Sequence, residues 1–241
     1  STDIRPTDVV TRADYDVMVE VTPTNVENGG PALHHIQTAL RRKKHVVTSN
    51  KGPIALAYPE LLAIAEENGV TLRYEATVCG AIPLIHAMQE GLAGNTISRL
   101  YGVFNGTCNY ILTRMAAEGL TYAQALAEAR ELGYAEADPT YDVEGIDAAI
   151  KLVILANTVL HMQTTLDRVE RTGIALLTPE ALQLAEEQEC TIRLIGEIIP
   201  KAGVLRVSPR ILTKTHPLVV EGTLNAVTVE TDLAGDLTFI G

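Results

Sequence analysis

Hydrophobic residues near the start of the chain follow two alternating patterns. Short apolar runs have the length and composition of strands, and the segments between them repeat apolar residues every three or four positions, as amphipathic helices do. Strands are expected at residues 16–21, 45–48 and 70–75, and helices at residues 31–43 and 55–68. Residues 1–12 show no strong period. This alternation predicts a parallel sheet with right-handed crossovers.

The rest of the chain groups its elements differently. Helices are expected at residues 83–94, from residue 106, at residues 122–132 and 146–160, and from residue 178. Strands are expected at residues 96–105, 191–199, 204–213, 225–231 and 237–240. This order is typical of an α+β domain with a mixed sheet. The predicted fold class is therefore α/β, with a partial Rossmann-like half followed by an α+β half.

The domain boundaries follow from this change of pattern. We expect a partial dinucleotide-binding domain at residues 1–75 and a substrate-binding and dimerisation domain at residues 76–236. Residues 237–241 are expected to begin a return to the first domain. The glycine turn G-x-G-x-x-G of dinucleotide-binding domains is absent from the sequence. Either an N-terminal portion is missing from this chain, or the domain never bound a dinucleotide.

The most distinctive apolar segment is the predicted helix at residues 146–160, which is apolar around its whole circumference. Such a helix is buried on all sides. Its only charge after Asp147 is Lys151, so this ammonium group is expected to be buried and to need a partner. Asp147 lies one helical turn earlier on the same face. The pair is either a structural ion pair or part of an active site, where a desolvated lysine acts as a general acid or a substrate anchor.

An acidic run precedes this helix and strengthens the functional interpretation. It contains Glu136, Asp138, Asp142, Glu144 and Asp147. Further candidates come from the parallel sheet, because ligands of such sheets bind beyond the carboxyl ends of the strands. Thr22, Lys51 and Glu75 all follow predicted strands.

Three shorter motifs carry weaker signals. Residues 50–53 are expected to form a tight turn, where Lys51 could reach a ligand or lie on the surface. Glu75 is followed by small residues whose carbonyl oxygens could bind a hard cation, although a bend between strand and helix explains them more simply. Asn105-Gly-Thr107 matches a glycosylation sequon, but we interpret it as a helix-capping turn.

Composition excludes several classes of function. The formal net charge is -11, and the only basic cluster lies at residues 41–44, which argues against nucleic-acid binding. The three cysteines have no C-x-x-C spacing, as in proteins of a reducing cytoplasm without a disulfide framework or a zinc site. No apolar segment is long enough to predict a membrane span.

The acidic run and the lysine that follows it resemble a known family signature. The stretch GYAEADPTYDVEGIDAAIKL is similar to the substrate signature of homoserine dehydrogenase, G-[YF]-x-E-x-D-P-x-x-D-x-x-G-x-D-x-x-x-K. Three further segments agree in order, namely VTSNKGP at residues 47–53, EATVCGAIPLI at residues 75–85 and GVFNGTCNYIL at residues 102–112. The resemblance extends from about Asp16 to the end of the chain.

The resemblance implies an oxidoreductase that interconverts L-homoserine and L-aspartate 4-semialdehyde with NADP or NAD, in threonine, methionine and isoleucine biosynthesis. It implies a homodimer located in the cytoplasm. The implied catalytic residues are Lys151 and Lys51, and the implied substrate-binding residues are Glu136, Asp142 and Asp147. Thr22, Lys51 and Gly133 would contact the cofactor, and Glu75, Val78, Gly80 and Ile82 match the family's monovalent-cation (sodium) site.

Two other functions stay open at this point. Relative to the family, the chain lacks the N-terminal strand with its glycine turn, and it stops at residues 237–241 before the last helix of the cofactor site. It is thus expected to be truncated, and a non-catalytic fragment that binds an amino acid or dimerises is one alternative. A dehydrogenase of another small amino acid is the second.

Overall fold

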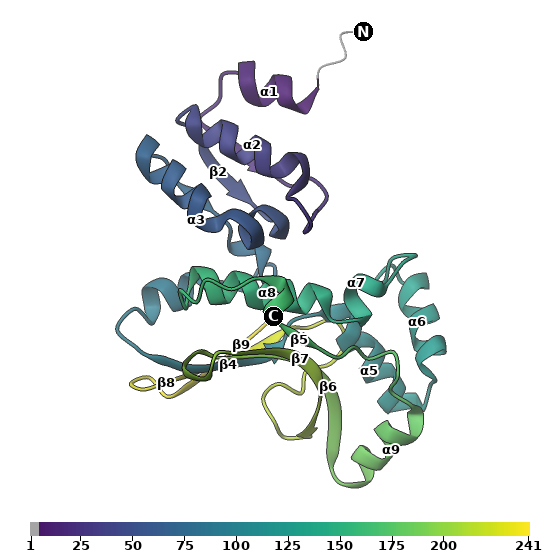
Figure 1. Ribbon diagram of the computed structural model, residues 1–241. Coiled ribbons are helices and arrows are strands. Elements are labelled where there is room, and N and C mark those ends of the chain that lie inside the picture. The colour runs from purple at the N-terminus through teal and green to yellow at the C-terminus, as the bar shows by residue number, and fades with distance from the viewer. Residues whose placement is uncertain (1–4) are drawn as a thin grey trace.

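The strands of the computed structural model form two separate sheets. The structure describes residues 5–241, so residues 1–4 of the predicted unperiodic segment lie outside the described residues. The N-terminal sheet has three strands, and the second sheet has six. In Figure 1 the three-stranded part lies on one side of the long helix α8 (Ile146–Thr158), and the six-stranded sheet lies on the other.

The N-terminal sheet contains the parallel strands predicted from the sequence. Its order is β1-β2-β3, and both neighbouring pairs are parallel. The strands are β1 (Val17–Glu20), β2 (His45–Thr48) and β3 (Leu72–Arg73), and the helices between them are α2 (Gly30–Arg41) and α3 (Lys51–Asn68). The last strand is shorter than expected. A helix that was not predicted, α1 (Pro6–Arg12), precedes them; Val10 is its only buried residue, so it has no apolar period to detect.

Helix α3 begins earlier than the sequence predicted, and the expected tight turn at residues 50–53 is wrong. The side chain of Asn50 accepts a hydrogen bond from the Gly52 backbone amide at 3.2 Å and caps the helix, so Lys51 is its first residue. Pro53 lies in the first turn, where its missing amide hydrogen costs nothing. The helix ends at Gly69, as predicted, with a left-handed φ of 66°.

The larger sheet is mixed, as expected. Its order is β5-β7-β6-β4-β8-β9, and every neighbouring pair is antiparallel except β5 with β7. The strands are β4 (Ile97–Val103), β5 (Glu170–Arg171), β6 (Cys190–Ile199), β7 (Val204–Thr213), β8 (Ala226–Thr231) and β9 (Asp236–Ile240). Strand β5, with two residues, was not predicted. Strand β9 forms one edge of this sheet by pairing with β8.

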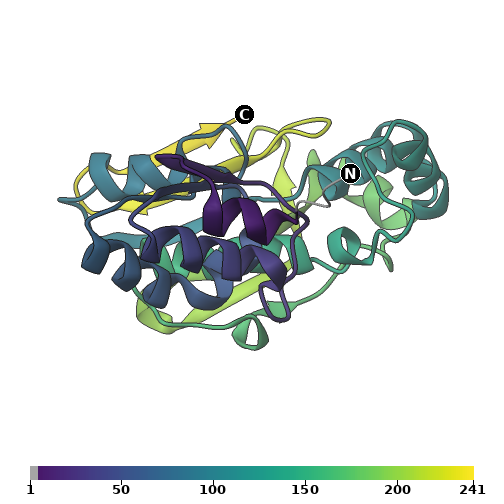
Figure 2. The same ribbon diagram turned by 90° about the horizontal axis from the view of Figure 1, so that it is seen from above.

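Helices pack against one face and one end of this sheet. They are α5 (Gly106–Glu118), α6 (Tyr122–Glu131), α7 (Thr140–Val143), α8 and α9 (Pro179–Glu187). The helix predicted at residues 83–94 is instead the short α4 (Leu84–His86) continued by a π-helix (Ala87–Gly91). Seen from above, the helices of the N-terminal part lie over one end of the molecule, and the segments around residues 120–130 and 180–187 lie at the other end (Figure 2).

The position of α8 explains its apolar circumference. It contacts α3 on one side and strands β6 and β7 on the other, so it is covered by both parts of the chain. Residues 147–156 are all buried apart from Lys151, which is partly exposed. The one turn of α8 that carries charge therefore lies where the two parts of the chain meet.

Candidate active site

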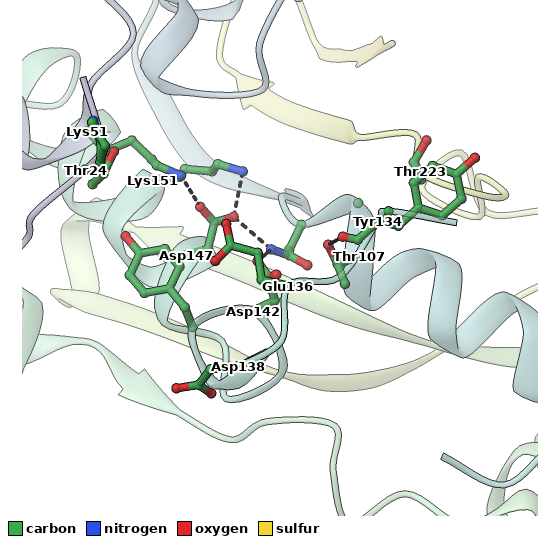
Figure 3. A pocket seen from close by; sticks show the side chains of 15 residues that line it. Thr24, Lys51, Thr107, Tyr134, Glu136, Asp138, Asp142, Asp147, Lys151 and Thr223 are labelled. Atoms are coloured by element: carbon green, nitrogen blue, oxygen red, sulfur yellow. Dashed lines mark hydrogen bonds and ion pairs between the residues drawn. The ribbon is translucent and has the colours of Figure 1, made fainter. Parts of the chain in front are cut away.

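A buried carboxylate bridges two lysines at the start of α8. Asp147 Oδ2 lies 2.8 Å from Lys151 Nζ, within the same helix, and Asp147 Oδ1 lies 2.5 Å from Lys51 Nζ, at the start of α3 (Figure 3). The two lysines are 100 residues apart in sequence, and only the packing of α3 against α8 brings them to one carboxylate. The side chains are 5% (Asp147), 13% (Lys151) and 22% (Lys51) exposed.

Charge, rather than burial, decides the ionisation of this group. Burial raises the pKa of Asp147, but the two ammonium groups outweigh it and hold that pKa well below the usual range. Burial lowers the pKa of Lys151, but the negative charge of Asp147 outweighs it and the net pKa is raised. Asp147 is therefore ionised and Lys151 protonated at neutral pH, as expected for a buried lysine with a carboxylate one turn away.

The turn that follows β4 contacts both members of this pair. Lys151 Nζ also donates to the carbonyl oxygen of Phe104 at 2.5 Å. The side-chain amide of Asn105 donates to Asp147 Oδ2 at 2.9 Å and to Asp142 Oδ1 at 2.7 Å. Burial is the main cause that raises the pKa of Asp142. The site thus holds two carboxylates in different electrostatic environments.

These groups open onto a cavity of about 900 Å³ between the two parts of the chain. Figure 3 shows the lysines directed at Asp147 on one side of the cavity, with Thr107, Tyr134 and Thr223 on another. The lining residues come from the segments after β1, β2, β4 and α6, from the start of α8 and from the loop before β8: Pro23, Thr24, Lys51, Asn105, Gly106, Thr107, Gly133, Tyr134, Glu136, Asp138, Tyr141, Asp142, Asp147, Lys151 and Thr223. The cavity is large enough for a small substrate together with part of a cofactor.

Most of the site residues expected from the sequence line this one cavity. They are Lys51, Gly133, Glu136, Asp142, Asp147 and Lys151. Thr22 follows β1 but is absent from the lining, which its neighbours Pro23 and Thr24 join instead. The backbone amide of Thr22 donates to Glu20 at 2.9 Å, its hydroxyl donates to the same carboxylate, and its carbonyl oxygen accepts from Asn50 at 3.0 Å.

The residues matched to a cation site lie apart from this cavity. Gly80 and Ile82 line a second cavity of about 560 Å³, which shares Lys151 and Thr223 with the first. Val78 is buried in the core. The carboxylate of Glu75 accepts the backbone amides of Ile85 at 2.8 Å and His86 at 3.0 Å. Within residues 5–241, no three acidic, histidine or cysteine side chains are grouped as metal ligands.

Two residues of the site were not identified as functional from the sequence. Asn105 was interpreted only as a helix-capping residue; it does cap α5, accepting the Cys108 amide at 2.8 Å, but it also binds both carboxylates. Tyr141 lines the cavity, and its ring lies 5.6 Å from Lys51 Nζ. Only the position of Asn105 at the end of the strand predicted at residues 96–105 could have drawn attention to it.

Comparison with known proteins agrees with this geometry. A family model described as "Homoserine dehydrogenase" matches residues 83–241, and one described as "Homoserine dehydrogenase, NAD binding domain" matches residues 5–75. The first match covers well over half of the chain. The chain belongs to the homoserine dehydrogenase family.

Individual relatives support the same assignment. The homoserine dehydrogenase of Methanocaldococcus jannaschii is 52% identical over 97% of this chain and 69% of its own length. The enzyme of Mycobacterium tuberculosis strain H37Rv is 46% identical over 97% of this chain, which spans 54% of its length. The structure of a hyperthermophilic archaeal homoserine dehydrogenase in complex with NADPH is similar with a TM-score of 0.83 and 33% identity, over 99% of this chain and 69% of that one.

These findings confirm the resemblance and the α/β fold class expected from the sequence. The family signature at residues 133–151 supplies eight of the residues that line the larger cavity, and these include both members of the Asp147–Lys151 pair. Within residues 5–241, no helix has both the length and the apolar character needed to cross a membrane.

Proposed function

We propose that this chain carries the active site of an oxidoreductase that interconverts L-homoserine and L-aspartate 4-semialdehyde, with NADP or NAD as the hydride carrier. The observation that carries the proposal is the buried carboxylate of Asp147 between two lysine ammonium groups, at the wall of a cavity rich in acidic residues. The family match supports this reaction and its place in threonine, methionine and isoleucine biosynthesis.

The carboxylates of the cavity select an amino-acid substrate by charge. Glu136 and Asp142 line the cavity, and neither is paired with a lysine or arginine in a salt bridge within the described part of the chain. They can receive the α-ammonium group of homoserine, while Asp147 orients the lysines toward the hydroxyl group. A substrate without a positive charge would leave these carboxylates facing an uncharged group, which disfavours its binding.

Lys151 handles the proton. During reduction the aldehyde oxygen gains negative charge, and the Lys151 ammonium group donates a proton to it; during oxidation the neutral amine accepts the hydroxyl proton. Because Asp147 raises the pKa of Lys151, the protonated form prevails at neutral pH. Lys51 supplies a second positive charge at the same carboxylate, so the two lysines and Asp147 together carry a net positive charge that favours negative charge on the substrate oxygen.

The residues at the carboxyl ends of β1 and β2 fit the nicotinamide end of a cofactor. When bound, that cofactor supplies or accepts the hydride. Pro23, Thr24 and Lys51 line the cavity there, and a Cβ built on Gly133 would meet no atom within 4 Å, so its backbone is open to close approach. Thr22 would contribute packing only, because its polar atoms are already bonded to Glu20 and Asn50. The match to a NAD-binding domain model and the NADPH complex of a relative support NADP or NAD.

A monovalent cation such as sodium is a further proposal for the segment of Glu75, Val78, Gly80 and Ile82. The backbone of Cys79 and Gly80 has positive φ angles of 56° and 58°, a turn that lets successive carbonyl groups point in different directions. Oxygen ligands of this kind suit hard cations. If the site exists, sodium chloride will raise the melting temperature more than choline chloride at equal ionic strength, and equal shifts would argue against it.

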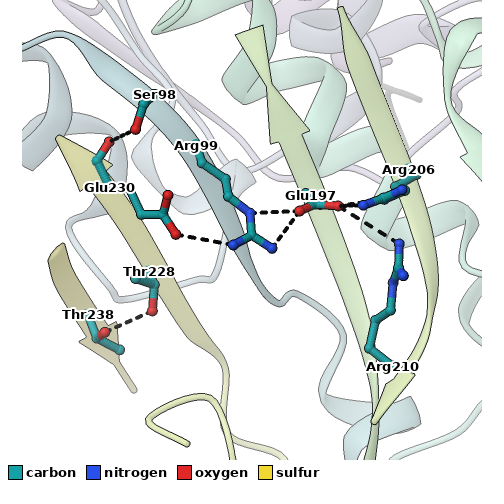
Figure 4. A network of polar contacts seen from close by, with 8 residues as sticks. All are labelled: Ser98, Arg99, Glu197, Arg206, Arg210, Thr228, Glu230 and Thr238. Carbon is teal, nitrogen blue, oxygen red and sulfur yellow. Dashed lines mark hydrogen bonds and ion pairs between the residues drawn. The ribbon is translucent and has the colours of Figure 1, made fainter. Parts of the chain in front are cut away.

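We also propose that the chain forms a homodimer through the face of the six-stranded sheet that lies opposite α8. In Figure 1 no helix covers that face. It carries Arg99, Arg206 and Arg210 around Glu197, beside a cavity of about 220 Å³ that is also lined by Tyr101 and Leu212 (Figure 4). Arginine and tyrosine beside apolar groups are typical of interfaces.

Light scattering tests the dimer directly. A dimer has twice the chain mass of 26.0 kDa. Arg210→Glu on the proposed face should shift the protein toward the monomer, whereas Arg41→Glu on α2, where the side chain is 56% exposed, should not. A monomeric wild type at micromolar concentration would contradict the proposal.

The division into domains and the location in the cell are part of the same proposal. The three-stranded sheet supports a nucleotide-binding domain at residues 1–75, and the six-stranded sheet supports a substrate and dimerisation domain at residues 76–236. Residues 237–240, expected to begin a return to the first domain, instead lie in β9 at the edge of the six-stranded sheet. Cys79, Cys108 and Cys190 are all free thiols, which agrees with the cytoplasm. Fractionation of the source cells tests this location, and recovery from an extracellular fraction would overturn it.

The reaction is tested by measuring nicotinamide absorbance with homoserine and each cofactor, in both directions. Calorimetry with homoserine and with NADP(H) on the same sample separates binding from turnover. Turnover of homoserine supports the proposal, and binding of homoserine without turnover identifies an amino-acid-binding fragment. Faster oxidation of another small amino acid would instead support a dehydrogenase of that substrate.

A further inference from the structure

Asn105 lies at the junction of the two carboxylates that the proposed reaction uses. Its side-chain nitrogen donates to Asp142 Oδ1 at 2.7 Å and to Asp147 Oδ2 at 2.9 Å. The residue is 5% exposed, so little water competes for these hydrogen bonds. A primary amide has two N–H donors, and here each one can bind a different carboxylate.

The orientation of this amide is determined by its other end. Asn105 Oδ1 accepts the backbone amide of Cys108 at 2.8 Å and caps α5. If the amide were rotated by 180°, its oxygen would face two carboxylate oxygens and its nitrogen would face a backbone N–H. Both arrangements are repulsive, so the donors must point at the carboxylates.

The neighbouring residue acts on the same group of side chains. The carbonyl oxygen of Phe104 accepts the ammonium group of Lys151 at 2.5 Å. The turn after β4 therefore contacts the lysine through one residue and its carboxylate partner through the next. The turn leads from β4 into α5, and its hydrogen bonds reach Asp142 on α7 and Asp147 and Lys151 on α8.

We propose that Asn105 is a positioning residue that holds Asp142 and Asp147 in register with each other and keeps both available as carboxylates. This inference rests on the proposed function, because it assigns a role within that active site. Asn105 acts through the carboxylates: it fixes the angle at which Asp147 meets Lys151, and its second hydrogen bond favours the charged form of Asp142 where burial opposes it.

The charged groups around Asp142 determine how its pKa changes when the Asn105 amide is removed. Burial and the negative charge of Asp147 raise the pKa of Asp142, while Asn105, Lys151 and Lys51 lower it. Other ionisable groups near this carboxyl are Cys108, whose thiol donates to the Asp142 carbonyl oxygen, the phenol of Tyr141, and the cavity residues Glu136 and Asp138. Without the amide donor, the pKa of Asp142 rises further, and its carboxylate is lost at a higher pH.

Asn105→Ser separates the two tasks of this side chain. Serine caps a helix about as well as asparagine, so α5 is retained, but it cannot reach both carboxylates. We expect kcat/KM for homoserine at pH 7 to fall about 10- to 100-fold, the scale of a lost hydrogen bond to a charged group. The acid limb of the kcat/KM profile should move to higher pH, because Asp142 ionises later.

Asn105→Asp provides a second variant of nearly the same shape. It also keeps the capping oxygen, but it places a third carboxylate against the other two. We expect a larger loss of kcat/KM than in Asn105→Ser and a larger displacement of the acid limb. A carbon-13 titration of the Asp142 carboxyl in the free protein gives a measurement independent of turnover, and its pKa should rise in both variants.

Thr178→Ala is the matched control. Thr178 caps α9 by accepting the Ala181 amide at 3.3 Å. Thr178 does not line the cavity. This variant loses a helix cap and should lower the melting temperature, while its pH profile stays that of the wild type. Asn105→Ser should show the opposite combination, with a retained helix cap, a small change in melting temperature and a displaced profile.

The outcomes separate this inference from the proposed reaction. If wild type oxidises homoserine but Asn105→Ser keeps the wild-type kcat/KM, acid limb and Asp142 pKa, the positioning role is wrong. If wild type shows no turnover, the reaction itself fails, and the carbon-13 titration still decides whether Asn105 controls Asp142. A raised Asp142 pKa with a displaced acid limb supports the inference.

Discussion

Two regions of this molecule place a buried carboxylate between two cations, and they differ in the kind of cation. At the cavity, Asp147 contacts Lys51 and Lys151 at 2.5 and 2.8 Å. On the larger sheet, Glu197 lies 2.6 Å from Arg99 on one side and forms a close pair with Arg206 on the other (Figure 4). Both carboxylate side chains are about 5% exposed or less.

The origin of the cations differs as well. The arginines lie on strands next to β6, which carries Glu197, so the sheet register alone aligns them. The lysines lie on α3 and α8, and only the docking of the two parts of the chain brings them together. An ammonium group can release its proton, whereas an arginine guanidinium cannot. The lysine cluster can therefore take part in proton transfer, and the arginine cluster only stabilises the sheet.

Removal of the central lysine should have the largest effect. Lys151→Ala is expected to lower kcat by about 10²- to 10⁴-fold, the usual contribution of a positioned acid or base. Lys151→Arg should be almost as slow, because it keeps the charge but cannot exchange the proton. Arg206→Ala, on the sheet, should keep kcat near that of the wild type. Steady-state kinetics at saturating homoserine measure all three, and an unchanged kcat in Lys151→Ala would remove its role.

Removal of the carboxylate should cost stability at the cavity. Asp147→Ala leaves a buried lysine without its partner and is expected to lower the free energy of unfolding by about 3–5 kcal/mol. Asp14→Ala is the control, because that side chain is fully exposed and its loss should change stability by less than about 0.5 kcal/mol. Urea denaturation measures both, and wild-type stability in Asp147→Ala would show that the pair is not a buried one.

Removal of the negative charge from the carboxylate on the sheet should cost less stability. Glu197→Gln removes the charge from the carboxylate, but Arg99 and Arg206 are each more than a third exposed in the single chain, so water compensates for the lost pair in the monomer. We expect a loss of about 1–2 kcal/mol, that of a charge-assisted hydrogen bond, and a retained kcat. Arg206→Lys should cost less than about 1 kcal/mol. A loss equal to that of Asp147→Ala would remove the distinction between the two clusters.

Alkaline pH should reduce the stability contribution of the lysine cluster and leave that of the arginine cluster unchanged. This is the smallest of the expected effects. The folded-state pKa of Lys151 is raised, so its contribution to stability is complete below its unfolded pKa of about 10.5 and is lost as pH rises through the folded value. Arg99 does not titrate in this range, since its pKa is raised as well.

Melting temperatures measured from pH 8 to about 11.5 test this difference. The destabilisation caused by Lys151→Met should shrink above about pH 10.5, whereas that caused by Arg206→Met should stay constant. If the destabilisation caused by the two variants changed in the same way with pH, the proposed difference between the lysine and arginine clusters would be wrong.

Local patterns predicted most of the elements correctly. The strands at residues 45–48 and 204–213 and the buried helix at residues 146–158 were predicted closely, because each has a clear apolar pattern and a defined end. Helix α1 and strand β5 were missed because they are short and bury few residues. The start of α3 was misplaced because Lys51-Gly-Pro reads as a turn unless Asn50 is recognised as the cap.

The candidate site divides in the same way. Asp147 and Lys151 could be paired from the sequence, since they are separated by one helical turn. The contacts of Asp147 with Lys51 and Asn105 span 96 and 42 residues, and no local period encodes them. Thr22 shows the opposite case. Its position after β1 was predicted, but its polar atoms are hydrogen-bonded to Glu20 and Asn50 and do not face the cavity.

The sequence by itself determined the elements, the family and the helix in which a lysine and an aspartate share one face, because these depend on interactions within a few residues. The tertiary structure alone decided that both lysines contact one carboxylate, that a cavity opens beside them, and that Asn105 joins the two carboxylates. Those contacts form only when α3, α8 and the turn after β4 pack together, and burial there gives the charges the strength that water would otherwise remove.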